Sequence, residues 1–264
     1  VLEKIGLGHD ALRERHPHLI VARLSGFGQT GPWAGRPGHD LNYMGLAGAL
    51  AAGAPGQDGP HPPPVQVADL SGALTAALGI AAALVERQRT GRGRILDVSL
   101  TEAALAVNAP HVATLTAEGR PARAGGELLS GAVPIYGTYR CADGRYLTVG
   151  ALEPRFQAEL ARHVGRPGRK ELRAAFAAHP RDHWVDLLAE ACVGPVLDPG
   201  ELADHPHLAA RGALERAGRT TFVRPPLADD GWTRGEVPAL GAHTDAILGE
   251  AGLSAEERDR LREA

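Results

Sequence analysis

Residues 23–40 read Arg23-Leu-Ser-Gly-Phe-Gly-Gln-Thr-Gly-Pro-Trp-Ala-Gly-Arg-Pro-Gly-His39-Asp40, with five glycines and two prolines in eighteen residues. They follow an apolar, strand-like run, Leu19-Ile-Val-Ala22. Such a composition cannot pack as a core. It predicts a shaped loop whose backbone turns tightly and comes close to a ligand. His39 and Asp40 end the loop just before the apolar residues 41–44, so the imidazole lies where the loop meets buried structure.

Part of this loop, Gly26-Phe-Gly-Gln-Thr-Gly31, matches the G-x-G-x-x-G pattern of dinucleotide-binding proteins. That site needs a helix to begin within the motif, so that the pyrophosphate meets the helix N-terminus. Residues 32–38 contain two prolines and two glycines, which break helices. The sequence therefore disfavours a nicotinamide site.

Composition limits the remaining function classes. The chain has 264 residues, 44% hydrophobic and only 4% aromatic, which fits one large or two modest domains of helices packed through small residues. A net charge of −3 gives no basic footprint, so we expect no nucleic-acid partner. Two cysteines, Cys141 and Cys192, form no disulfide framework and favour a reducing, cytoplasmic location. The His-x-His pairs at 16–18 and 205–207 have no third ligand in view, so no metal site is expected.

No signal peptide is recognisable, and the longest apolar run does not predict a membrane span. This run, 70–85, is interrupted by Ser71, Gly72, Thr75 and Gly79 and is short for a bilayer. We therefore expect a buried helix and no membrane partner.

Local patterns predict the main elements. Helices are expected at 10–16, with Asp10 as N-cap, at 70–89, with Asp69 as N-cap, and at 101–119, bent at Pro110. Strands are expected at 19–24 and 95–100, and a hairpin pairs 136–141 with 145–150. Residues 52–64 read as a proline-rich loop, 213–240 as strands and loops, and the tail from 244 as a helix. Two amphipathic helices are expected within 157–193.

Several motifs resemble those of α-methylacyl-CoA racemases, within the family III CoA-transferase superfamily. They are Ser-Gly-Phe-Gly-Gln-Thr-Gly-Pro at 25–32, Gly-His-Asp-Leu-Asn-Tyr at 38–43, and Thr-Gly-x-Gly-x-x-x-Asp-Val at 90–98. The resemblance runs along nearly the whole chain in the expected order. The third motif occurs in racemases and transferases alike, so it identifies the fold and not the reaction.

This resemblance implies an α/β fold in which a Rossmann-like large domain carries a small α+β domain, assembled as an interlocked homodimer. The expected division is 1–125 for the remainder of the large CoA-binding domain, 126–215 for the small domain with its crossover linker, and 216–264 for the return segment and C-terminal helix. The family's opening βα units are expected to be missing, since the chain starts at Val1 and the resemblance begins within the family's usual length.

The resemblance also implies the site residues. His39, Asp69 and Glu153 would be catalytic, with Glu153 as the carboxylate that pairs with the imidazole. Residues expected to contact CoA are Lys4, Leu24, Gly38, Asp40, Tyr43 and Ala68. No separate cofactor is expected, because CoA is part of an acyl-CoA thioester substrate. Asp69 could instead be only a helix cap, Asp40 a cap of the helix that follows it, Lys4 a solvated lysine, and Glu153 only a first-turn residue beside Pro154.

Racemisation beside a thioester needs two groups of opposite protonation state on the two faces of the carbon, and a site for the enolate oxygen. We expect His39, paired with Glu153, to serve one face and Asp69 the other, with backbone amides at the start of the Asp69 helix holding the oxygen. Because Glu153 lies far along the chain, the site should form between domains or between subunits.

Two alternatives remain open. A family III CoA-transferase would use Asp69 as a nucleophile that forms an acyl anhydride, and a chain without the N-terminal CoA site could bind ligand without catalysis. The Gly-His-Asp motif favours the racemase. Two departures from the racemase pattern bear on substrate approach: Leu-Ser-Gly-Ala at 70–73 replaces a glycine run, and Gly137 replaces an Asp. The acyl chain is left open among branched fatty acyl, bile-acid-like and short 2-methyl groups.

Overall fold

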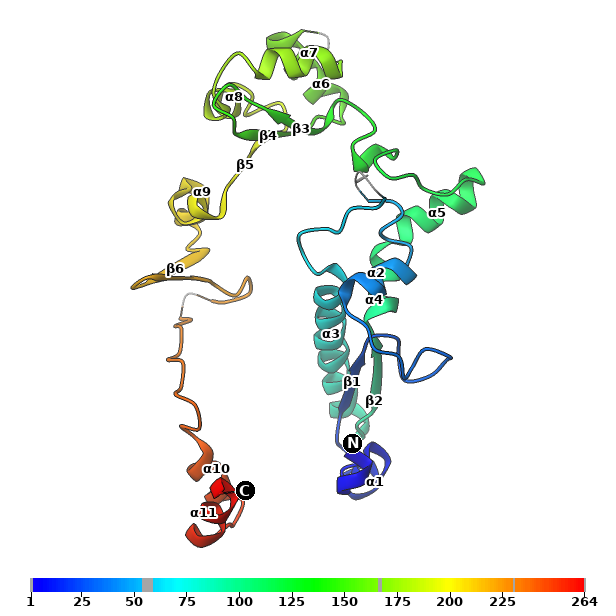
Figure 1. The fold of residues 1–264 in the computed structure, drawn as a ribbon, viewed down its shortest axis with the longest axis vertical. Coiled ribbons are helices and arrows are strands. Elements are labelled where there is room, and N and C mark those ends of the chain that lie inside the picture. The colour runs from blue at the N-terminus through cyan, green and yellow to red at the C-terminus, as the bar shows by residue number, and fades with distance from the viewer. Residues whose placement is uncertain (1, 54–58, 166–167, 230, 264) are drawn as a thin grey trace. The chain divides into compact units, whose positions relative to one another are not determined.

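The computed structural model describes residues 2–53, 59–165, 168–229 and 231–263. Its contacts divide the chain into two units, Val1–Val196 and Leu197–Ala264 (Figure 1). The three-part division expected from the sequence remains a prediction. Residues 54–58 of the expected loop 52–64 lie outside the described residues.

The first part of unit 1 is built on two parallel strands, β1 (Val21–Ser25) and β2 (Ile95–Ser99), paired in register from Val21 with Ile95 to Ser25 with Ser99. The long helix α3 (Val67–Thr90) lies in the connection between them, as a parallel pair requires. The other elements are η1 (Leu2–Ile5), α1 (His9–Arg15), α2 (Asp40–Leu46), α4 (Leu100–Val107) and α5 (Ala109–Glu118).

Three helix boundaries differ from the sequence prediction. The N-cap of α1 is Gly8, not Asp10. The predicted helix 101–119 is divided at Asn108 into α4 and α5, because Pro110 has no N–H to donate and is accepted only in the first turn of a new helix. Helix α3 has Gln66 as its N-cap, so Asp69 lies inside the first turn and is not the cap.

Small residues bring the helices of this part together. The core cluster comprises Tyr43, Met44, Ala47, Ala68 and Ala104, with Phe27 and Leu100 packed against it. A Cβ on Gly72 would lie 2.2 Å from Cδ2 of Leu100, so a side chain at this position would force the Leu100 side chain of α4 to shift.

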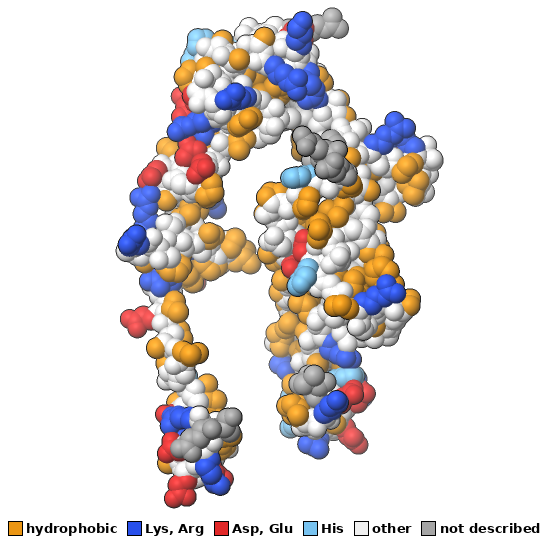
Figure 2. Space-filling view, viewed as in Figure 1, with side chains coloured by type: hydrophobic (Ala, Val, Ile, Leu, Met, Phe, Trp, Pro, Cys, Tyr) orange, Lys and Arg blue, Asp and Glu red, His pale blue; other side chains and the backbone are white. Residues whose placement is uncertain are grey.

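The expectation that α3 is a buried helix is wrong for this chain. Its buried residues are Ala68, Gly72 and Ala83, while Leu70, Leu74 and Leu78 are 57%, 72% and 72% exposed. Hydrophobic side chains accordingly gather along α3 (Figure 2). The strands β1 and β2 and the helices α2 and α4 pack against part of α3 and leave these leucines exposed. By length and hydropathy α3 could cross a membrane, a test that core helices of soluble proteins also pass.

The second part of unit 1 is a three-stranded antiparallel sheet packed against three helices. The strands β3 (Tyr136–Arg140), β4 (Tyr146–Gly150) and β5 (Val193–Val196) lie in the order β3-β4-β5. The predicted hairpin is therefore confirmed. Three helices replace the two expected within 157–193: α6 (Pro154–Val164), α7 (Arg169–Phe176) and α8 (Arg181–Leu187).

These elements enclose the larger of the two described cores, around Tyr139, Leu147, Leu160, Phe176 and Trp184. The ring of Phe176 is fully buried between Tyr139 and Trp184, at centroid distances of 5.3 and 5.4 Å. Three of the chain's eleven Phe, Trp and Tyr rings are buried in this core, and Phe156 packs against it.

The segment that enters this sheet, including η2 (Leu128–Ser130), is held by an ion pair. Arg120 donates two hydrogen bonds to the Glu127 carboxylate, at 2.7 and 3.1 Å, and Arg123 N–H donates a third at 3.0 Å. These hydrogen bonds, chiefly that from Arg120, lower the pKa of Glu127 to about 2.

This shift predicts an acid-dependent contribution to stability. Because the folded pKa lies below the ordinary value of 4.5, the contribution is complete above pH 4.5 and disappears as the pH falls toward about 2. The difference in urea midpoint between the wild type and Glu127→Gln should therefore be largest at pH 6 and shrink on acidification. Glu118→Gln, at a more exposed carboxylate on the same Arg120, is the matched control. A difference that is constant with pH would contradict the assignment.

Unit 2 is a hairpin with short helices on either side. Strands β6 (Leu214–Ala217) and β7 (Thr220–Val223) pair antiparallel, and the tail helices begin at Thr244, as expected. Its helices are η3 (Pro199–Asp204), α9 (Pro206–Ala210), α10 (Thr244–Glu250) and α11 (Ala255–Glu263).

Candidate active site

The glycine-rich loop after β1 is held in shape by residues of β2 and α4. The Asp97 carboxylate accepts from Gln29 N–H at 3.1 and 3.2 Å, and Thr101 donates to Gly26 O through its N–H at 3.0 Å and its hydroxyl at 2.8 Å. These partners are 68 and 75 residues apart in the chain. The loop that carries His39 is thus fixed by the strand next to β1.

Tyr43 packs against the glycine-rich loop and hydrogen bonds it. Its side chain is 7% exposed, and its hydroxyl donates to Gly38 O. The Phe27 ring meets it edge-on at 5.0 Å. Burial raises the pKa of the Tyr43 hydroxyl, and the negative charge of Asp69 raises it further, so the Asp69 carboxylate acts on this tyrosine. Tyr43 therefore supports the loop structurally, and its expected contact with CoA remains a prediction.

A glycine is required at position 26 by this packing. A Cβ there would lie 2.3 Å from Cε1 of Tyr43, whose ring is held from both sides. We expect Gly26→Ala to lower the free energy of unfolding by about 1–3 kcal/mol, because the ring has no room to move. Gly35→Ala is the matched control in the same loop, since no heavy atom lies within 4 Å of a Cβ at that position. Equal urea midpoints for the two variants would contradict this account.

His39 and Asp40 form the junction between the loop and α2. His39 is the N-cap residue, and its N–H donates to Asn42 Oδ1 at 3.0 Å. Its side chain is exposed and takes part in a capping box, in which the imidazole faces the backbone N–H of Asn42 at the start of α2. The imidazole is thus available to solvent or a ligand.

Asp40 caps a different helix from the one expected. Its Oδ1 accepts from Ala68 N–H at 2.7 Å and from Asp69 N–H at 3.1 Å, both in the first turn of α3. Asp40 is the first residue of α2, but its carboxylate accepts hydrogen bonds from amides 28 and 29 residues further along the chain. The amides of a helix's first turn have no acceptor within their own helix. The side chain of Gln66 does not accept from them, so the Asp40 carboxylate is their acceptor. The hydrogen bond from Asp69 N–H therefore links Asp69 to Asp40, the neighbour of His39 in the chain.

Asp69 presents an exposed carboxylate from this first turn. The amides expected to bind an enolate oxygen are already engaged: Ala68 N–H and Asp69 N–H by Asp40, and Leu70 N–H by Gln66 O at 3.0 Å. The bond to Asp69 N–H is longer than the bond to Ala68 N–H. Shared hydrogen bonds are common at helix ends, so the Asp69 amide is the one that a substrate oxygen could share with Asp40.

Glu153, the expected partner of the His39 imidazole, lies in the second part of unit 1. It is the N-cap of α6, exposed, with Pro154 at the first helical position. No hydrogen bond or ion pair links it to His39 among the described residues, and its pairing remains a prediction. The non-functional alternative expected from the sequence was a residue of the first helical turn. Glu153 instead lies one position before that turn, as the N-cap residue, and its side chain makes no cap hydrogen bond.

The other expected CoA contacts occupy varied environments. Lys4 is exposed in η1, and Leu24 is 49% exposed on β1. Gly38 accepts from Tyr43, and the Ala68 side chain is fully buried, which leaves only its backbone for a ligand. The assignment of these residues to CoA binding stays a prediction.

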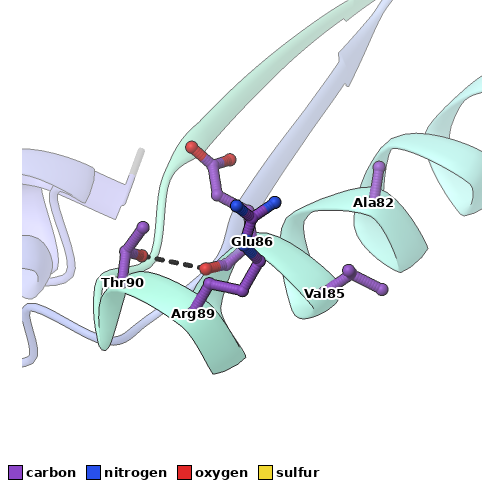
Figure 3. A pocket seen from close by; sticks show the side chains of 5 residues that line it. All are labelled: Ala82, Val85, Glu86, Arg89 and Thr90. Atoms are coloured by element: carbon purple, nitrogen blue, oxygen red, sulfur yellow. Dashed lines mark hydrogen bonds between the residues drawn. The ribbon is translucent and has the colours of Figure 1, made fainter.

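Two surface pockets lie away from these residues. One, beside the C-terminal end of α3, is lined by Ala82, Val85, Glu86, Arg89 and Thr90, and Thr90 donates to Glu86 O at 3.0 Å (Figure 3). A groove over the open face of β3–β5 is lined by nine residues, among them Gly137, Thr148 and Cys192. Neither includes His39 or Asp69. The first is shaped by helix-end packing and has no arrangement suited to catalysis.

From the sequence, Asp97 has no role beyond a fold motif, although it holds the loop. Asp40 is among the expected site residues, but the helix that Asp40 caps is α3 and not the helix that follows it. For the first, the local signal is a charged residue inside an apolar strand, since Asp97 is the middle residue of β2. No local signal exists for the second, because Asp40 lies at the start of one helix and acts on another.

Comparison with known proteins places these features in a family. A family model described as CoA-transferase family III matches residues 1–244. Alpha-methylacyl-CoA racemase from Homo sapiens is 35% identical, over 97% of this chain and 73% of the human protein. Acetyl-CoA:oxalate CoA-transferase from Acetobacter aceti is 32% identical, over 88% of this chain and 65% of that protein.

A solved structure has the same fold. The CAIB/BAIF family protein from Brucella suis superposes with a TM-score of 0.79 and 25% identity, over 94% of this chain and 72% of that one. The mixed α/β fold expected from the motifs is therefore confirmed, while the interlocked dimer remains a prediction.

Proposed function

Because this chain belongs to CoA-transferase family III, we propose that it racemises or epimerises 2-methylacyl-CoA thioesters by moving one proton at the α-carbon. The observation that carries the proposal is the link between the Gly-His-Asp motif and the first turn of α3. The carboxylate of Asp40, the residue next to His39, accepts hydrogen bonds from the backbone N–H groups of Ala68 and Asp69. An imidazole and a carboxylate on joined elements supply the acid–base pair that the reaction requires.

The mechanism uses the two groups on opposite faces of the α-carbon. His39 takes the α-proton from one enantiomer, and Asp69, protonated at that stage, returns a proton to the other face. In the reverse direction the roles exchange. The enolate oxygen that forms between these steps would accept from Asp69 N–H, near the positive end of the α3 dipole.

The pairing of His39 with Glu153 is proposed to need a second copy of the chain. Glu153 has no contact with His39 in one chain, and an interlocked homodimer of the kind that the motifs imply would supply it across the interface. A carboxylate beside the imidazole would orient the ring and stabilise its protonated form.

CoA transfer is the second candidate function. It is favoured by the exposed Asp69 carboxylate in a helix first turn and by the similarity to a CoA-transferase. In that reaction Asp69 would attack the thioester carbonyl, release CoA thiolate and form a mixed anhydride. The thiolate would then attack the Asp69 carbonyl, which releases the donor carboxylate and leaves an Asp69–CoA thioester. The acceptor carboxylate would displace CoA thiolate from it to form a second anhydride, and attack of the thiolate on the acceptor acyl group would give the new CoA thioester and free Asp69. That chemistry has no step for His39.

The test is proton exchange at the α-carbon. The protein is incubated with one enantiomer of a 2-methylacyl-CoA in D₂O and followed by NMR. Incorporation of deuterium with loss of stereochemical purity supports the racemase. Transfer of CoA to an added free carboxylic acid, without exchange, supports the transferase. Absence of both, with CoA-ester binding retained in a calorimetric titration, would favour a ligand-binding protein and overturn the enzyme proposals.

A further inference from the structure

We propose that Asp40 is a positioning residue: its carboxylate ties the start of α2 to the first turn of α3 and thereby sets the separation of His39 and Asp69. Its effect on turnover rests on the function proposed above. The tie itself is a property of the fold and can be tested without activity.

The geometry makes Asp40 the direct covalent and hydrogen-bonded link between the two groups. One peptide bond joins it to His39, and one hydrogen bond of 3.1 Å joins it to the backbone of Asp69. The stronger anchor is the 2.7 Å bond from Ala68 N–H, whose side chain is fully buried in the core beneath. The carboxylate is thus held by a part of α3 that cannot shift without disturbing the core.

The helix has no substitute for this partner. Gln66, its N-cap residue, makes no side-chain hydrogen bond to the first turn. Loss of the Asp40 carboxylate would leave two amides of α3 unpaired, and the start of the helix would move relative to α2. A displacement of about 1 Å at reacting groups can cost about 100-fold in rate.

Hydrogen–deuterium exchange measures the tie directly. In Asp40→Ala, peptides covering 66–70 should exchange faster than in the wild type, while peptides of α6 are unchanged. Asp40→Asn keeps an oxygen acceptor at Oδ1 and should retain slow exchange. Equal exchange in the wild type and Asp40→Ala would overturn the proposal, whether or not the protein is active.

Kinetics then distinguish positioning from a charge effect. We expect kcat for α-proton exchange to fall about 10–100-fold in Asp40→Ala, with a much smaller change in KM, and Asp40→Asn to restore most of kcat. Asp10→Ala, on the exposed side of α1, is the matched control. Asp40→Asn could instead lose as much activity as Asp40→Ala while its amides at 66–70 still exchange slowly. That result would show that the charge of Asp40, and not its hydrogen bonds to α3, matters, and it would overturn the proposal.

A double variant separates capping from positioning. Gln66→Asp places an acceptor at the N-cap of α3, where a side chain can reach the second or third amide of the helix. Combined with Asp40→Ala, it should restore slow exchange in the first turn without restoring kcat, because the link to His39 is still missing. Recovery of kcat along with slow exchange would reduce Asp40 to a cap and overturn the positioning role. An inactive wild type would reject the proposed function alone, because the amide hydrogen–deuterium exchange measurements still test whether Asp40 holds the first turn of α3.

Discussion

Replacing His39 with Gln is expected to lower the rate of α-proton exchange by about 100- to 10,000-fold, the usual contribution of a general acid or base. Gln keeps a polar side chain of similar length at the start of α2 but cannot take a proton from carbon. Because the imidazole is exposed, and because Gln can also accept from the Asn42 N–H that faces it, the substitution should leave the fold intact. The measurement is deuterium incorporation from D₂O, with circular dichroism to verify folding.

Two further variants make this result specific. Asp69→Asn should remove exchange as well, and would also remove CoA transfer, because both reactions use that carboxylate. His163→Gln, at an exposed histidine that contacts Glu159 on α6, is the matched control and should keep the wild-type rate. If His39→Gln exchanges the α-proton at the wild-type rate, the racemase mechanism proposed here is wrong. Unaltered CoA transfer in the same variant would then favour the transferase.

Replacing Phe176 with Ala is expected to lower the free energy of unfolding by about 3–5 kcal/mol. The ring is fully buried and contacts Tyr139 and Trp184, so its removal leaves a cavity that two large rings cannot fill. Trp184 Nε1–H also donates to Phe176 O, at 3.2 Å, which couples α7 to α8. Urea unfolding followed by tryptophan fluorescence measures the change.

The consequence should extend to the site. Leu160 of α6 belongs to the same core, and Glu153 is the N-cap of that helix. Phe176→Leu, which keeps most of the buried surface, should cost distinctly less than the alanine variant. Leu187→Ala, at a 42% exposed position on α8, should have little effect. A loss in Phe176→Ala no larger than in Leu187→Ala would contradict the assigned core.

Much of the local structure could be predicted from the sequence. The strand before residue 25, the parallel partner after residue 94 and the hairpin at 136–150 all appear where apolar runs, glycines and turn residues indicate them. Helix ends were less accurate, as for Asp10 and Asp69, because several neighbouring residues can cap a helix and packing chooses among them.

The burial of α3 could not be predicted for a related reason. Its apolar composition favours burial but does not say what would cover the helix. In this chain β1, β2, α2 and α4 pack against part of it, and Leu74 and Leu78 stay exposed.

The sequence by itself determined the family, the order of the elements and the residue types available for chemistry, because these follow from motifs and from interactions between residues a few positions apart. Only the tertiary structure decided which helix Asp40 caps and why Gly26 must be glycine beside Tyr43. Each of these depends on groups separated by 17 to 29 positions. Packing of the whole chain, and not local preference, brings such groups together or keeps them apart.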